Sequence, residues 1–176
     1  MPSARPGSFA TISRRWQGRT EVTLDLGSDP VLERRFHDSV TLVRGPLIYS
    51  LRVSERWERI NAEVAGRELP HGDWEVKPEG AWSCALALAA GRPLSGIRFE
   101  SRGTGEQPFS PEGAPVVARA TGRRVAGWGI EHGAAAPPPP SPVPPESLEG
   151  EETELELIPY GCTNLRMTEL PWYWSK

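Results

Sequence analysis

The residues of this 176-residue chain that could do chemistry are its carboxylates, three histidines and two cysteines. Glycoside hydrolysis needs two carboxyl groups roughly 5 to 9.5 Å apart on either side of a sugar. Glu154 and Glu156 lie two apart in an alternating stretch, so they share one face of a strand. The leucines between and after them take the opposite face, which leaves both carboxylates in water. We therefore expect no catalytic pair from them.

The histidines and cysteines form no pattern typical of a reactive site. His37, His71 and His132 stand apart, without metal-ligand spacing and without a nucleophile motif around them. Two cysteines alone cannot make a thiolate zinc site. Cys84 and Cys162 are interpreted as free buried thiols, and a disulfide between them stays open because sequence does not fix pairing. We expect no catalytic residue, no cofactor and no metal.

Seven tryptophans offer a different chemistry, the stacking of an aromatic ring on the apolar face of a sugar. Five are scattered and are interpreted as core or rim residues: Trp16, Trp57, Trp74, Trp82 and Trp128. The densest aromatic cluster is Trp172, Tyr173 and Trp174. This cluster, with Trp128, is the predicted contact surface, either a sugar platform or the patch that packs against a partner domain.

Short strands are the elements that would position these side chains. With 19 Pro and 18 Gly, long helices are disfavoured. Period-two alternation predicts strands that include residues 9–13, 21–26, 31–36, 39–44, 47–53, 74–76, 97–100, 116–121, 125–128, 153–158 and 165–170. Residues 81–90 favour helix by propensity but also alternate, and we assign them to a strand. The sequence therefore predicts an all-β fold, an antiparallel, jelly-roll-like β-sandwich with little helix.

One sandwich region accounts for most of the chain. We expect residues 1–8 to be a disordered N-terminus and residues 9–176 to form the sandwich, with a sub-boundary near 54–72 and a Pro-rich surface loop over 133–150. Within that loop, Pro137 to Pro145 should be extended polyproline. It either connects two strands rigidly, links domains, or presents a ligand to a proline-recognising domain.

Charge and hydropathy exclude several classes of partner. The net charge is −3 and the acidic stretch 146–156 is interpreted as solvated, so we expect no nucleic-acid partner. Residues 1–15 hold no apolar run like that of a signal peptide, and no stretch approaches the ~20 apolar residues of a membrane span. The expectation is a soluble chain with no membrane partner, cytoplasmic by default.

Several segments together are similar to one family. They are residues 9–16, 22–26, 43–51 and 157–166, and the most specific block is Arg44-Gly45-Pro46-Leu47-Ile48-Tyr49. These segments resemble the β-L-arabinofuranosidase-like glycoside hydrolases of the six-hairpin superfamily, the glycoside hydrolase family 127 type. In that family they belong to the β-sandwich regions that follow an (α/α)6 catalytic barrel.

The resemblance implies a role without chemistry. The family's nucleophile, acid and metal ligands, including a zinc-bound cysteine, lie in the barrel, and no position of this chain matches those motifs. Cys84 and Cys162 are therefore not that site, and no catalytic residue is carried over. The implied function is a non-catalytic accessory module that buttresses or completes the (α/α)6 catalytic domain of a glycosidase.

Two alternatives from other classes stay open. The first is a stand-alone carbohydrate-binding module that uses surface tryptophans, so that carbohydrate itself is the partner. The second is a protein-interaction domain that presents the segment from Pro137 to Pro145. The sequence leaves the sugar and the oligomeric state open.

Overall fold

The computed structural model describes residues 7–24 and 27–175, and its regular structure is almost entirely β-strand. The strands of the described residues are β1 (Pro30–Arg34), β2 (Val40–Arg44), β3 (Leu47–Leu51), β4 (Glu55–Ile60), β5 (Asp73–Pro78), β6 (Cys84–Leu88), β7 (Arg98–Ser101), β8 (Val116–Val125), β9 (Ile130–Glu131), β10 (Ala134–Ala135), β11 (Leu148–Pro159) and β12 (Trp172–Trp174). Short 3-10 helices span Phe36–Asp38, Pro145–Ser147 and Tyr160–Cys162. The predicted all-β class with little helix is confirmed.

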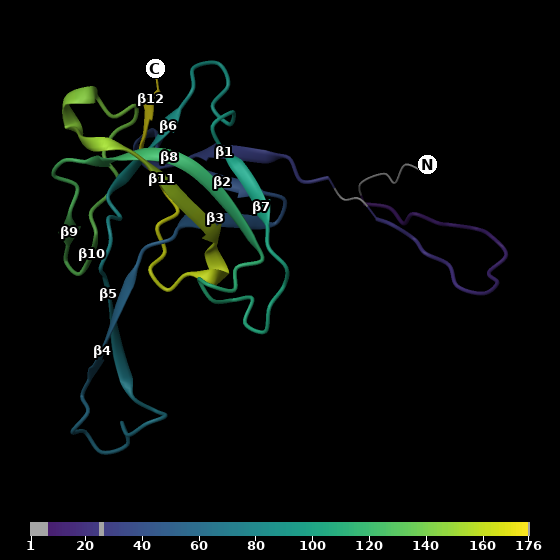
Figure 1. Cartoon of the computed structure of the whole chain (residues 1–176), viewed down its shortest axis with the longest axis horizontal. Helices are drawn as coiled ribbons and strands as arrows, with labels where there is room; N and C mark the ends of the chain where they lie inside the picture. The colour runs from purple at the N-terminus through teal and green to yellow at the C-terminus, as the bar shows by residue number, and fades with distance from the viewer. Residues whose placement is uncertain (1–6, 25–26, 176) are drawn as a thin grey trace.

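Eight strands form one curled sheet (Figure 1). Its order is β1-β2-β3-β11-β8-β6-β12, and β7 pairs with β8 beside this path. Every pair is antiparallel except β12 with β6, which is parallel. Because the strands belong to a single sheet of mixed direction, a two-sheet jelly-roll sandwich is not confirmed.

The C-terminal segment closes this sheet on itself. Leu170 and Val40 exchange both backbone hydrogen bonds, at 2.8 and 2.9 Å, and Met167 O accepts from Leu51 N at 2.8 Å. A few residues later, β12 pairs with β6 on the other side. Hydrogen bonds thus run from β3 through β11, β8, β6 and the C-terminal segment back to β2 and β3, as in a small barrel.

Along each strand apolar and polar side chains alternate, and the apolar ones fill the interior of the curled sheet. In β11, Leu155 and Leu157 are buried and face the small residues Ala118 and Ala120 of β8. The remaining large members of this core come from β2, β3, β6 and the C-terminal segment: Val40, Leu42, Tyr49, Leu51, Leu86, Leu88, Leu170 and Trp172. Burial of this apolar surface is the main favourable contribution to folding.

A second core lies on the other side of β6 and β12. It contains Ala85, Val125, Trp128, Leu148, Tyr173 and also Val143, which belongs to the Pro-rich segment. Val143 N donates to Trp172 O at 2.7 Å, and Ser141 N donates to His37 O at 2.9 Å. The Pro-rich segment, which leads from β10 to β11, is therefore tied to the body by packing and by hydrogen bonds.

Two hairpins stand outside the large sheet. β4 pairs with β5 over six residues of each strand, from Glu55↔Pro78 to Ile60↔Asp73, and β9 pairs with β10. In Figure 1 the β4–β5 hairpin projects from the body and carries the loop 61–72 at its far end. The expected sub-boundary near 54–72 falls within this hairpin.

The N-terminal part of the prediction is wrong where the structure describes it. Residues 9–13 and 21–24 form no strand, and residues 25 and 26 lie outside the described residues, as do residues 1–6. Figure 1 shows residues 7–24, which we call the N-terminal arm, as a long excursion away from the sheet. Residues 165–170 are also not a strand, because Met167 and Leu170 make only isolated bridges.

Candidate functional site

The four predicted contact residues do not form one exposed surface. Trp128, Trp172 and Tyr173 are buried, and only Trp174 is about half exposed. Trp172 and Tyr173 alternate along β12 and enter the two different cores. The prediction of a shared platform is therefore corrected, because a strand buried on both faces cannot present consecutive aromatic rings to a sugar.

The polar ends of these buried rings are satisfied inside the protein. Trp172 Nε1 donates to Asp38 O and Trp128 Nε1 to Ala136 O, both at 2.8 Å, while the Tyr173 hydroxyl donates to Glu152 at 2.9 Å. Burial is the main cause that raises the pKa of Tyr173, and the bond to Glu152 adds to it. Satisfied hydrogen bonds and burial together indicate a packing role.

Glu154 and Glu156 lie on the outer face of β11, as predicted, but arginines bind both. Arg119 contacts Glu154 at 2.7 Å and Glu156 at 3.3 Å. Arg52 donates to Glu156 at 2.8 Å. Further ion pairs with Arg98, Arg102, Glu100 and Glu112 extend this network across β7, β8 and β11.

Glu156 is held in its ionised form. Burial acts to raise the pKa of its carboxyl, but the hydrogen bond from Arg52 and the charges of Arg102, Arg52 and Arg119 outweigh burial and lower it. A general acid of a glycosidase needs the opposite shift. The pair is therefore a structural ion network.

The thiols are free and the described residues hold no metal-binding cluster. Cys84 and Cys162 are buried and unpaired, as interpreted from the sequence. Cys162 Sγ donates to Pro108 O at 3.2 Å, and burial raises the pKa of both thiols. Among residues 7–24 and 27–175, no group of three or more His, Cys, Asp and Glu side chains is placed to hold a metal ion.

The aromatic pair that the structure does expose is on the projecting hairpin. Trp57 of β4 and Trp74 of β5 are 50% and 46% exposed, and their rings meet edge to face with centroids 6.4 Å apart. The register pairs Trp57 with Val76 and Arg59 with Trp74, so all four side chains lie on the same hairpin face. The ion-paired Glu58, Glu75 and Lys77 occupy the opposite face.

One carboxylate fixes the base of this hairpin to the body. Glu55 Oε1 accepts from the backbone N of Asn164 and of Leu165, both at 3.3 Å. Its Oε2 accepts from Asn164 Nδ2 at 2.9 Å and from Trp57 Nε1 at 3.2 Å. Glu55 thus orients an exposed indole and ties it to the loop after β11, which leaves Trp57 little freedom.

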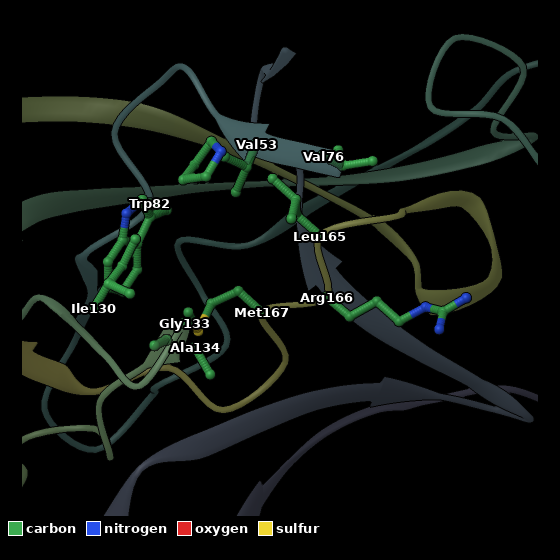
Figure 2. A pocket seen from close by; sticks show the side chains of 11 residues that line it. Val53, Val76, Trp82, Ile130, Gly133, Ala134, Leu165, Arg166 and Met167 are labelled. Atoms are coloured by element: carbon green, nitrogen blue, oxygen red, sulfur yellow. The ribbon is translucent and has the colours of Figure 1, made fainter. Parts of the chain in front are cut away.

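The same hairpin face leads into an apolar cavity of about 190 Å³. Its wall comes from the hairpin base, the β9–β10 hairpin and the C-terminal loop: Val53, Val76, Pro78, Trp82, Ile130, Gly133, Ala134, Ala135, Leu165, Arg166 and Met167. In Figure 2 the Arg166 guanidinium points away from the other labelled side chains. It lies 4.6 Å from the centre of the Tyr160 ring, and most of the residues that line the cavity are apolar.

The sequence held a weak signal for this site. Trp57 and Trp74 are interpreted from the sequence as core or rim residues because they are scattered along the chain. Over 73–77, Trp74 and Val76 alternate with charged residues, which is typical of a strand with one apolar face, whereas Trp57 stands alone among the charged residues of 55–59. What the sequence lacks is the register, which alone brings the two indoles together.

Within residues 7–24 and 27–175, no helix is both long and apolar enough to cross a bilayer. Comparison of the chain with family models, with curated proteins and with solved structures found no match.

Proposed function

We propose that this chain is a non-catalytic accessory module that docks on the catalytic domain of a glycoside hydrolase and buttresses it. The observation that carries the proposal is the N-terminal arm. Its sequence alternates like strand sequence, yet residues 7–24 form no strand in the described chain. Its apolar side chains are exposed: Phe9, Ile12, Trp16, Val22 and Leu24.

Exposed apolar residues at this density are unusual for a free surface. Single exposed apolar residues are common, but five within one extended segment indicate a contact surface. An extended segment with alternating side chains gains backbone hydrogen bonds when it is added to the edge of another sheet or covered by another domain. The arm therefore supports a function in which a second domain completes the structure.

The class of that second domain comes from the resemblance to β-L-arabinofuranosidase-like hydrolases. In that family the matching segments follow an (α/α)6 barrel, and one of them, residues 9–16, lies within the arm. The ion-paired state of Glu154 and Glu156 also favours a module that contributes no acid or base of its own.

Co-expression with a catalytic barrel tests this proposal. The probe is the (α/α)6 barrel of a β-L-arabinofuranosidase-like hydrolase from which the C-terminal sandwich region has been deleted. We expect the 176-residue chain to co-purify with the barrel and to raise its melting temperature, because a partner that binds only the folded state stabilises it.

Two phenylalanines provide a matched pair of variants. Phe9 in the arm is 99% exposed and Phe109 in the loop before β8 is 81% exposed, so neither substitution by Ser disturbs a core. Phe9→Ser should weaken co-purification and lower the gain in melting temperature, whereas Phe109→Ser should change neither. Equal co-purification and equal gains in melting temperature for the two variants would contradict docking through the arm. So would failure of the unmodified chain to bind the barrel.

A further inference from the structure

We propose that the Trp57–Trp74 face of the β4–β5 hairpin, together with the apolar cavity at its base, is a carbohydrate-binding site. The inference rests on the proposed function for the class of ligand. The site itself is separate from the N-terminal arm in sequence and in place (Figure 1).

The geometry of the hairpin provides a continuous surface. On β5, Trp74, Val76 and Pro78 follow one another on one face toward the body, and Trp57 of β4 lies beside Val76. Val76 and Pro78 also line the cavity, so the exposed indoles and the cavity form one strip. An extended ligand that lies along this strip contacts two aromatic rings and then enters the cavity.

The size of the cavity also indicates an extended ligand. Pockets that enclose a whole drug-sized ligand measure about 300–1,000 Å³. The cavity here is about 190 Å³, so it accepts one ring or chain end and leaves the remainder outside. The two indoles lie where that remainder would run.

One charged group on the strip, the Arg59 guanidinium, is of a kind that sugar hydroxyls can bind. Trp57 Nε1 donates to Glu55, and Arg59 Nε, from the same hairpin face, is buried with no hydrogen-bond partner among the described residues. Arg59 Nη2 donates to Arg67 O at 2.8 Å, which fixes the guanidinium beside Trp74, whereas Asp73, which bonds Asn61 at 3.0 Å, lies on the opposite face. Aromatic faces flanked by hydroxyl partners favour a sugar over a wholly apolar ligand.

Glu55 is a positioning residue in this site. It holds Trp57 Nε1 and three groups of the 164–165 loop, and that loop forms part of the cavity wall. The indole is therefore oriented before a ligand arrives, which lowers the entropy lost on binding.

Affinity electrophoresis of the full chain tests the proposal. The probes are soluble arabinan, arabinogalactan and xyloglucan cast in native gels. We expect the unmodified chain to be retarded in at least one gel. Trp57→Ala or Trp74→Ala should weaken the apparent affinity for that polysaccharide at least tenfold. Glu55→Gln should weaken it by less and should shift the tryptophan emission. Retardation in none of these gels overturns the proposal.

The matched control is Trp16→Ala, since Trp16 is also half exposed but lies in the arm. It should bind like the unmodified chain, and near-UV circular dichroism should confirm that every variant keeps its core. Equal loss for Trp16→Ala and Trp57→Ala would overturn the proposal. Self-association of the chain that Trp57→Ala abolishes, without retardation, would assign the face to a second copy and overturn it too.

The outcomes of the sugar-binding test and of the docking test are independent of each other. Loss of retardation with intact co-purification of the barrel would remove the sugar site and leave the accessory module. Retardation without co-purification would remove the module and leave sugar binding by the hairpin, since the Trp57 and Trp74 variants do not touch the arm.

Discussion

Tyr49 of β3 and Pro159 of β11 face each other across an antiparallel pair, although 110 residues separate them in the chain. Each belongs to a segment from which the sequence predicts a resemblance to the β-L-arabinofuranosidase-like hydrolases. Tyr49 is buried in the core, and its ring meets Phe99 edge to face at 5.6 Å. The two segments are therefore parts of one packing unit at the centre of the sheet.

The ion network on the outer face predicts a pH-dependent loss of stability for Glu156→Gln. Glu156 is 19% exposed and contacts three arginines. Its substitution should cost about 1–2 kcal/mol at pH 7, between the values for exposed and buried pairs. Urea denaturation checks this value.

The direction in which pH changes the contribution of Glu156 to stability follows from the direction of its pKa shift. The pKa of Glu156 is lower in the folded protein than in the unfolded chain, so its ionised form stabilises the fold above the unfolded pKa. The difference between the unmodified chain and Glu156→Gln should be full at pH 7 and shrink as pH falls through the folded pKa. Glu112→Gln, at a 76% exposed side chain with one arginine partner, should cost about 0.5 kcal/mol or less. A larger cost for Glu112→Gln than for Glu156→Gln would contradict the assignment.

A methyl group at Gly122 should disrupt the sheet. A Cβ there would lie 2.4 Å from Leu155 Cδ1 and 2.5 Å from the backbone O of Ala85. Because β8 is paired with both β6 and β11 at this point, Gly122→Ala should cost about 3 kcal/mol, near the upper end for overpacking. Thermal unfolding measures the loss, with Gly129→Ala as the control because its added Cβ would meet nothing within 4 Å. Similar melting temperatures for the two variants would show that β8 is not packed as described.

Removal of the Trp172 side chain separates packing from sugar binding. Trp172 is buried, donates to Asp38 O, and lies in the segment that closes the sheet. Trp172→Ala should therefore cost about 3–5 kcal/mol, whereas Trp16→Ala in the arm should cost less than about 0.5 kcal/mol. A stable Trp172→Ala protein with weaker sugar binding would restore the aromatic cluster as a platform.

The thiols should be unreactive until the protein unfolds. Both are buried, and burial raises the pKa of each, which lowers the thiolate fraction at neutral pH. A thiol titration with an aromatic disulfide reagent at pH 8 should detect no fast-reacting group in the native chain and two groups in guanidinium. Detection of neither group after unfolding without reductant would mean that Cys84 and Cys162 are oxidised.

The central strands could be predicted from the sequence because apolar residues at every second position indicate a strand with one buried face. β2, β3, β6 and β11 are confirmed, and in β11 the leucines are buried while Glu154 and Glu156 face outward. Residues 9–13 and 21–24 show similar alternation and form no strand. Alternation specifies that a segment has two faces, but it does not supply the partner strand.

The candidate site could not be predicted because it depends on long-range register. Trp172, Tyr173 and Trp174 looked like a surface patch since they are adjacent in sequence. Parallel pairing with β6 instead buries two of them on opposite sides of the sheet. Trp57 and Trp74 are 17 residues apart, and only the β4–β5 register places them on one face.

Hydrogen exchange of the arm is the most direct measurement of the proposed function. In the free chain, backbone amides of residues 9–24 should exchange fast, because they belong to no strand. When the catalytic barrel is added, these amides should become protected, while those of β8 and β11 stay as slow as before. Fast exchange of residues 9–24 in the presence of saturating barrel would contradict the account.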